Sequence, residues 1–231
     1  MSLRQDLASD IAAGLAGWYQ LQCVQGLGGL SGEDSARLIT AQVVNAQGRY
    51  APTKSQLPRY WGAVKYRIDL AIKGRAANSS DWYGAIEIKW PGESIDRNQT
   101  RGQLVQDVVR VTFVPTNNLN AKFLVLGGSA DALARLFDTP HPQAAAPEAR
   151  RVALNTLLSR NLAQPSGELT YTQWSTNFPE AGDRVPPSVF GQFNGKLKCE
   201  LLAAGDSMVA GASVASAYVW QCNRTRGTAT P

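Results

Sequence analysis

The sequence predicts an α/β fold in which a mixed sheet is flanked by helices. Helix-period and strand-period segments alternate along residues 1–137 in the order helix, two or three strands, helix, strand, helix. Apolar residues make up 44% of the 231-residue chain and charged residues 18%, which suits a folded domain with a core. No apolar run reaches the roughly 18 residues of a membrane-spanning helix, and the N-terminus lacks a secretory pattern. We therefore expect a cytoplasmic protein without a membrane segment.

Two helices are expected at the N-terminus. Residues 1–22 carry apolar side chains at spacings of three and four, which is typical of an amphipathic helix, and the segment QGLGGL breaks this pattern. Ser31, followed three residues later by Asp34, resembles a capping box. This arrangement predicts a second helix from about residue 32 to residue 47.

A long hairpin and a helix–strand–helix segment are expected next. The segment RYAPTKSQLPRYW is rich in Pro and basic residues and is interpreted as a loop. The turn-forming segment GRAANSSD separates two runs with strand character. The expected elements are strands 63–73 and 82–90, a helix over 95–111, a strand over 122–126 and a helix over 130–137.

The composition changes after Phe137, which divides the chain into a core of residues 1–137 and a C-terminal extension of residues 138–231. The segment TPHPQAAAP reads as a linker or long loop. Beyond it we expect a helix over residues 148–162 and strands in the segments ELTYTQW, KLKCELLAA and SVASAYVWQC. The extension is therefore β-rich, and whether it packs on the core is left open.

Several kinds of active site are excluded by the scarcity of Cys and His. The cysteines Cys23, Cys199 and Cys222 are too few and too scattered for a disulfide framework or a zinc site. The single histidine, His141, lies between two prolines in a loop. Catalysis by Ser-His-Asp or Cys-His groups and by histidine-bound metals is therefore not expected.

Charged residues of the hairpin form the strongest candidate for chemistry. If the hairpin turns about Asn78, Asp69 lies opposite Glu87, and Lys89 shares the face of Glu87 because side chains alternate along a strand. Two adjacent carboxylates raise each other's pKa unless a cation lies between them, and Mg²⁺ or Mn²⁺ suits oxygen ligands. Such a site can activate water for phosphodiester hydrolysis, with Lys89 assisting the nucleophile or the transition state.

The segments Arg67-Ile68-Asp69-Leu70 and Glu87-Ile88-Lys89 resemble the motif of the PD-(D/E)XK nuclease superfamily. The resemblance covers roughly residues 31–137. It implies a restriction-endonuclease-like core of αβββαβ order and a nuclease that depends on Mg²⁺ (or Mn²⁺) and acts on DNA. It further implies that Asp69 and Glu87 bind the metal and that Lys89 is the catalytic lysine. Ile68 stands where the superfamily commonly has Pro.

Two further residues follow from the resemblance. Many members have an acidic residue on the helix before the sheet and a Gln on the helix after the triplet. Glu33 and Gln103 are the matching residues, both expected to be catalytic and Glu33 also a metal ligand. As alternatives, Glu33 serves only the helix N-terminus or pairs with Arg37, and Gln103 belongs to an ordinary polar stripe over residues 99–110.

The net charge of +5 favours a polyanionic partner such as DNA, with 15 basic and 11 acidic residues in residues 1–137. The candidates for nucleic-acid contact are Arg59, Lys65, Arg67 and Tyr83. Aromatic side chains at strand ends also serve ordinary packing, which is the alternative for Tyr83.

The expected function is therefore metal-dependent hydrolysis of DNA. Two alternatives stay open. One is a catalytically silent module of the same fold that binds nucleic acid or protein. The other is a component of a defence or toxin system that is active only with a partner. A second copy of the chain or a protein partner is also compatible with the sequence.

Overall fold

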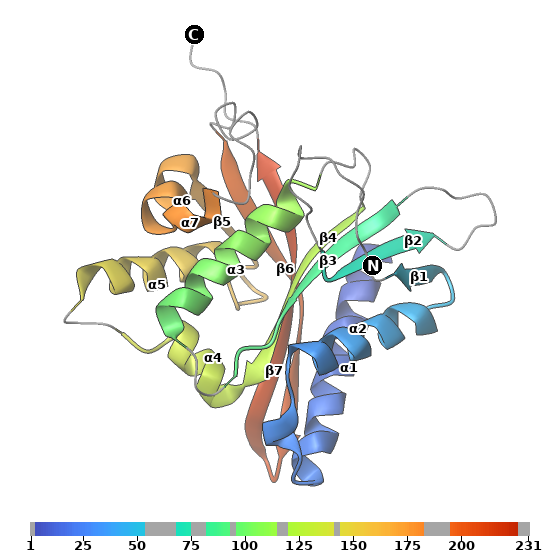
Figure 1. Ribbon diagram of the computed structural model, residues 1–231. Helices are drawn as coiled ribbons and strands as arrows, with labels where there is room; N and C mark the ends of the chain where they lie inside the picture. Colours follow the sequence, from blue (N-terminus) through green and yellow to red (C-terminus); the bar gives the residue numbers. More distant parts are fainter. Residues whose placement is uncertain are drawn as a thin grey trace.

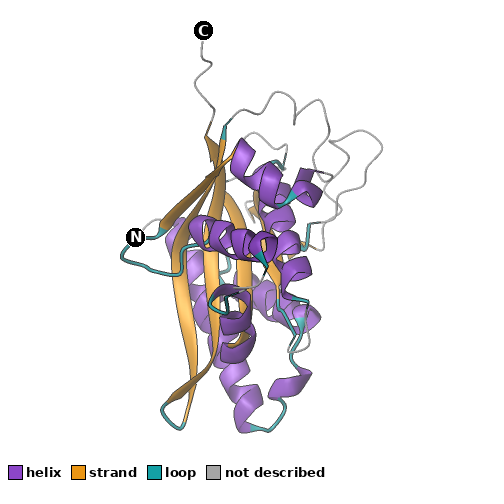
Figure 2. Ribbon diagram, turned by 90° about the vertical axis from the view of Figure 1, so that its left-hand side faces the viewer, coloured by secondary structure: helices purple, strands orange, loops and turns teal. Residues whose placement is uncertain are grey.

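The computed structural model describes residues 3–53, 68–74, 82–92, 96–114, 120–140, 144–182 and 195–225. In these residues a seven-stranded mixed sheet separates two layers of helices (Figures 1 and 2), which confirms the predicted α/β class. The strands are β1 (Tyr50–Thr53), β2 (Leu70–Gly74), β3 (Trp82–Lys89), β4 (Ala121–Ser129), β5 (Ser166–Thr170), β6 (Lys196–Val209) and β7 (Ala212–Thr225).

The helices divide between the two faces of the sheet (Figure 1). Helices α1 (Leu3–Val24) and α2 (Glu33–Ala46) lie on one face, joined by the short 3₁₀ helix η1 (Gly28–Leu30). The opposite face carries α3 (Arg97–Thr112), α4 (Ala130–Phe137), α5 (Ala145–Leu157), α6 (Tyr171–Asn177) and α7 (Pro179–Gly182). No helix in the described ranges is long and apolar enough to cross a membrane.

The sheet has the order β1-β2-β3-β4-β7-β6-β5. Only β3 and β4 pair in parallel, because helix α3 connects them, and the other neighbouring strands are antiparallel. Strand β4 pairs with β7 over the full register from Phe123–Gln221 to Ser129–Ala215. The strands that follow Phe137 therefore continue the sheet of residues 1–137.

Each face of the sheet has its own apolar cluster. On the α3 side the cluster includes Leu104, Val108 and Leu124, and on the α1 side it includes Ile11 and Ile86. Burial on both faces explains why β4 reads as a nearly continuous apolar run.

Helix α1 lies unusually close to strand β6. Its buried face alternates large side chains with Ala8, Ala12 and Ala16. A Cβ atom added at Gly205 of β6 would lie 2.7 Å from the carbonyl oxygen of Ala12, so only glycine permits this approach. The hydroxyl of Ser207 donates a 2.7 Å hydrogen bond to the carbonyl of Ala16. The N-terminal helix is thus fixed directly on the C-terminal hairpin.

Two elements differ from the sequence prediction because hydrogen bonding to neighbours decides them. Tyr50–Thr53, expected within a loop, forms edge strand β1 by pairing with β2. Tyr171–Trp174, expected at the end of a strand, begins helix α6 instead. The side chain of Thr170 accepts from the backbone N–H of Gln173, whose side chain accepts from the backbone N–H of Thr170. This capping box ends β5 and starts the helix.

The helix boundaries near the predicted caps also shift. Helix α2 has Gly32 as its N-cap without a side-chain hydrogen bond, so the prediction of Ser31 as N-cap was wrong. Helix α5 spans Ala145–Leu157 rather than residues 148–162. Cys199 and Cys222 are buried neighbours on β6 and β7, as expected of small apolar side chains, and His141 lies outside the described residues.

Candidate active site

The register of β2 and β3 brings the two predicted carboxylates together. Leu70 pairs with Ile86 and Ala71 with Ala85, which confirms the predicted alignment of the hairpin. When the same register is continued by one residue, Asp69 lies beside Glu87. Asp69 precedes β2, and its Oδ2 accepts a 2.8 Å hydrogen bond from the backbone N–H of Ile88. The Asp69 side chain therefore accepts the hydrogen bond of a backbone N–H group on β3, at the point where β2 begins.

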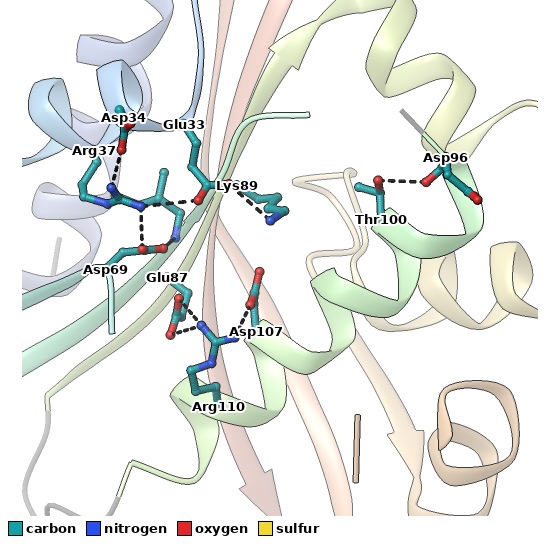
Figure 3. Close-up of polar contacts among 11 residues, drawn as sticks. Glu33, Asp34, Arg37, Asp69, Glu87, Lys89, Asp96, Thr100, Asp107 and Arg110 are labelled. Atoms are coloured by element: carbon teal, nitrogen blue, oxygen red, sulfur yellow. Dashed lines mark hydrogen bonds and ion pairs between the residues drawn. The ribbon is translucent and has the colours of Figure 1, made fainter. Parts of the chain in front are cut away.

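Strand β3 extends beyond the start of β2, and this offset opens the site. β2 begins at Leu70, opposite Ile86, whereas β3 continues to Lys89. Helix α2 on one face and helix α3 on the other can therefore both reach side chains near the end of β3 (Figure 3). Ile68 packs in the α3-side cluster, whereas Leu70 packs on the α1 side. Residues two apart in a regular strand share a face, so the regular alternation of side chains is interrupted at Asp69.

Four charged residues form what we call the α2 half of the site: Glu33, Asp34, Arg37 and Asp69. The Nη2 atom of Arg37 lies 2.8 Å from Oδ1 of Asp69 and 3.4 Å from Oε1 of Glu33. Its Nη1 atom lies 2.6 Å from Oδ1 of Asp34. Lys89 joins this half, because its Nζ lies 3.2 Å from Oε2 of Glu33 (Figure 3).

Three further residues form the α3 half: Glu87, Asp107 and Arg110. The Nη1 atom of Arg110 lies 3.0 Å from both oxygens of Glu87, and its Nη2 atom lies 3.1 Å from Oδ1 of Asp107. The Glu87 side chain is only 1% exposed and that of Asp107 only 8%. Burial of charged groups is tolerated here because the guanidinium lies between them.

Burial changes the protonation of the α3 half. Burial, and next the charge of Asp107, raises the pKa of Glu87 well above its ordinary value, although Arg110 opposes this shift. Burial likewise raises the pKa of Asp107 to about 7 against the opposing charges of Arg110 and Lys89. For Arg110, burial lowers the pKa, but the charges of Glu87 and Asp107 outweigh burial and the pKa is raised. Burial therefore favours the protonated forms of the two carboxylates, against the charge of Arg110.

The predicted site residues do not all meet. Asp69, Lys89 and Glu33 belong to the ion pairs of the α2 half, whereas Glu87 pairs with Arg110 in the α3 half. Glu33 contacts Lys89 rather than Glu87. Gln103 lies half-buried on α3, one turn before Asp107, and within the described residues no hydrogen bond joins it to Glu87 or Lys89. Of the polar stripe to which it was assigned, Gln106 instead donates to the carbonyl of Glu180.

The candidates for nucleic-acid contact divide in another way. Arg59, Lys65 and Arg67 lie outside the described residues. Ile72 pairs with Gly84 but Lys73 pairs with Trp82, so Tyr83 is the extra residue of a β-bulge. The bulge turns Tyr83 away from the face of Glu87, and its ring packs on Tyr50 with centroids 4.5 Å apart. Tyr83 therefore lies apart from the carboxylates of the candidate site.

Sequence reasoning missed Asp107 and the contact of Arg110 with Glu87, whereas the ion pair of Arg37 with Glu33, one of the alternatives for Glu33, is confirmed at 3.4 Å. Asp107 belongs to the buried face of α3, between Leu104 and Val108. A carboxylate among the core-facing residues of a helix is itself a signal, because such groups are rarely buried without a partner. Arg110 lies three residues further on, which is the spacing of a helical ion pair. The pair could have been found from the sequence on this basis.

The chemistry of the donor set fits a hard divalent cation. Asp69 and Glu87 are the two carboxylates that Mg²⁺ ordinarily takes from a protein, its other positions being filled by water and substrate phosphate oxygens. The raised pKa values of Glu87 and Asp107 indicate that further positive charge would be stabilising. In the described ranges no three His, Cys, Asp or Glu side chains are grouped closely enough to hold a metal by themselves. Any metal here would therefore depend on water and substrate oxygens.

Comparison with known proteins adds no relative. No protein-family model, curated protein or solved structure matches the chain.

Proposed function

We propose that this protein is a metal-dependent nuclease that hydrolyses phosphodiester bonds in DNA, with a core of the restriction-endonuclease-like kind. The observation that carries the proposal is the convergence of Asp69, Glu87 and Lys89 at the offset between β2 and β3. Burial raises the pKa of Glu87 there although Arg110 opposes the shift, and the charge of Lys89 acts on the neighbouring Asp107. This combination suits hydrolysis of an anionic diester without a histidine.

Each residue has a role that its contacts support. A bound Mg²⁺ or Mn²⁺ supplies a Lewis acid and lowers the pKa of a bound water. Asp69 and Glu87 would hold it, since they approach one another from adjacent strands. The Lys89 ammonium would orient the attacking water or stabilise charge on the phosphate. Glu33, 3.2 Å from Lys89, fixes the direction of the lysine side chain.

The test compares wild type with Lys89→Met and with Lys196→Met. Lys196 is a matched control because it is also a strand lysine in an ion pair with a glutamate, Glu168, and it belongs to β6. Supercoiled, linear and single-stranded DNA would be incubated with Mg²⁺, with Mn²⁺ and with a chelator. We expect cleavage that requires metal, falls by about 100-fold or more in Lys89→Met and is unchanged in Lys196→Met.

A second candidate is a silent module that binds nucleic acid through the same surface. One observation favours it: Arg37 and Arg110 already occupy oxygens of Asp69 and Glu87. This candidate predicts salt-sensitive DNA binding without metal-dependent cleavage on any of the three substrates. If both metals fail to bind by calorimetry and no DNA is cut, the nuclease proposal is wrong.

A further inference from the structure

Arg110 lies where a cation is expected between two buried carboxylates. Its guanidinium bridges Glu87 on the sheet and Asp107 on helix α3, at 3.0 Å and 3.1 Å (Figure 3). One nitrogen contacts both oxygens of Glu87, so the whole carboxylate faces the arginine. A small cation held by the same two groups would need the same space.

The guanidinium of Arg110 is in direct ion-pair contact with both carboxylates. Glu87 and Asp107 are almost fully buried, so water screens their charges little. On the other side of the site, both oxygens of Asp69 are already engaged, by Arg37 and by the N–H of Ile88. A divalent cation that approaches Asp69 and Glu87 is therefore repelled by the guanidinium of Arg110 on α3.

We infer that Arg110 is a built-in substitute for the divalent cation, which neutralises Glu87 and Asp107 in the metal-free protein and must release Glu87 when metal binds. The inference rests on the proposed function. It makes Arg110 a positioning residue that competes with the metal, rather than a group that touches the reacting atoms. Removing it should strengthen metal binding while weakening the metal-free fold.

Calorimetric titration with Mn²⁺ at pH 8 tests the competition. We expect Arg110→Gln to bind Mn²⁺ about tenfold more tightly than wild type, because like-charge repulsion is removed. Arg150→Gln is the matched control, since Arg150 has similar exposure and pairs with Glu180 at 2.9 Å on α7, outside the site. Its affinity should equal that of wild type. An affinity of Arg110→Gln that is unchanged or weaker overturns the inference.

A second measurement uses the wild-type chain, so it does not depend on the folding of Arg110→Gln. The side-chain Nε–H signal of Arg110 in an NMR spectrum is identified by its absence from Arg110→Lys. We expect saturating Mg²⁺ to shift this signal and to leave that of Arg150 in place. A signal of Arg110 that does not move when Mg²⁺ is bound overturns the inference.

The two proposals fail in different ways. If wild type binds Mn²⁺ and cuts DNA but Arg110→Gln binds no more tightly, only the role of Arg110 is wrong. If neither wild type nor Arg110→Gln binds Mn²⁺ and DNA is not cut, the nuclease proposal and this inference both fall.

Discussion

The α2 half and the α3 half of the candidate site contain the same kinds of charged group in different surroundings. In the α2 half, the side chain of Asp34 is 95% exposed and that of Glu33 is 36% exposed. In the α3 half, the carboxylates of Glu87 and Asp107 are nearly inaccessible to water. Both halves are organised by one arginine on a helix, Arg37 or Arg110.

The difference shows that burial, rather than residue type, decides what an ion pair does. In the exposed half, solvent screens the charges and each pair contributes little to stability. In the buried half, burial raises the pKa values of Glu87 and Asp107 even though Arg110 opposes the shift. The buried half therefore sets the charge balance of the site, and the exposed half is the one that is open to solvent.

The largest expected effect is on stability. Arg110→Gln removes the ion-pair partner of two buried carboxylates, Glu87 and Asp107, so we expect it to lower the free energy of unfolding by about 3–5 kcal/mol. Arg37→Gln, the equivalent change in the α2 half, should lower it by about 1 kcal/mol because its partners are more exposed. Urea unfolding at pH 8 without metal measures both. Equal losses would contradict the contrast between the two halves.

A smaller effect is expected on the pH dependence of stability. In the folded protein burial raises the pKa of Asp107 from its ordinary 3.8 to about 7, so between these values the folded state holds more protons than the unfolded state. Stability therefore falls as the pH rises through this range. Asp107→Asn should flatten that fall in urea unfolding, although Glu87 still contributes to it. An unchanged slope in Asp107→Asn would contradict the raised pKa of its carboxyl.

The smallest expected effect concerns cleavage. Glu33→Gln removes the ion pair with Lys89 but retains a hydrogen-bonding group, so we expect metal-dependent cleavage to fall by about tenfold. Asp34→Asn, also at the start of α2 and paired with Arg37, should change the rate by less than about twofold. Initial rates on supercoiled DNA measure both. A full loss of cleavage in Glu33→Gln would instead assign Glu33 to the metal.

Local pattern was enough to predict much of the fold. The turn segment GRAANSSD between two strand-like runs predicted the pairing of β2 with β3, and a helix was predicted over residues 95–111, where α3 lies. These predictions hold because each helix or strand buries one side, and the apolar residues of that side recur at a fixed spacing in the sequence. A regular alternation of side chains between the two faces of β3 does not extend to Tyr83. A β-bulge shifts the alternation there, and the composition of the strand does not reveal it.

The candidate site was predicted in part for the same reason. Asp69, Glu87 and Lys89 lie on adjacent strands, so their approach follows from register alone. Asp107 and Arg110 come from a helix more than 15 residues further along the chain, and their contact with Glu87 depends on how α3 crosses the sheet. The spacing of apolar residues along a helix predicts which of its faces is buried. It does not predict which residues of the sheet that face contacts.

The sequence by itself determined the α/β class, the register of the hairpin and the position of two carboxylates beside a lysine, because these depend on periodicities of a few residues. The tertiary structure alone decided that β7 continues the sheet beside β4 and that α2 and α3 meet at the end of β3. It also decided the burial of Glu87 and Asp107, and with it their raised pKa values. Burial and long-range pairing arise from elements that are distant in the chain, and no local pattern encodes them.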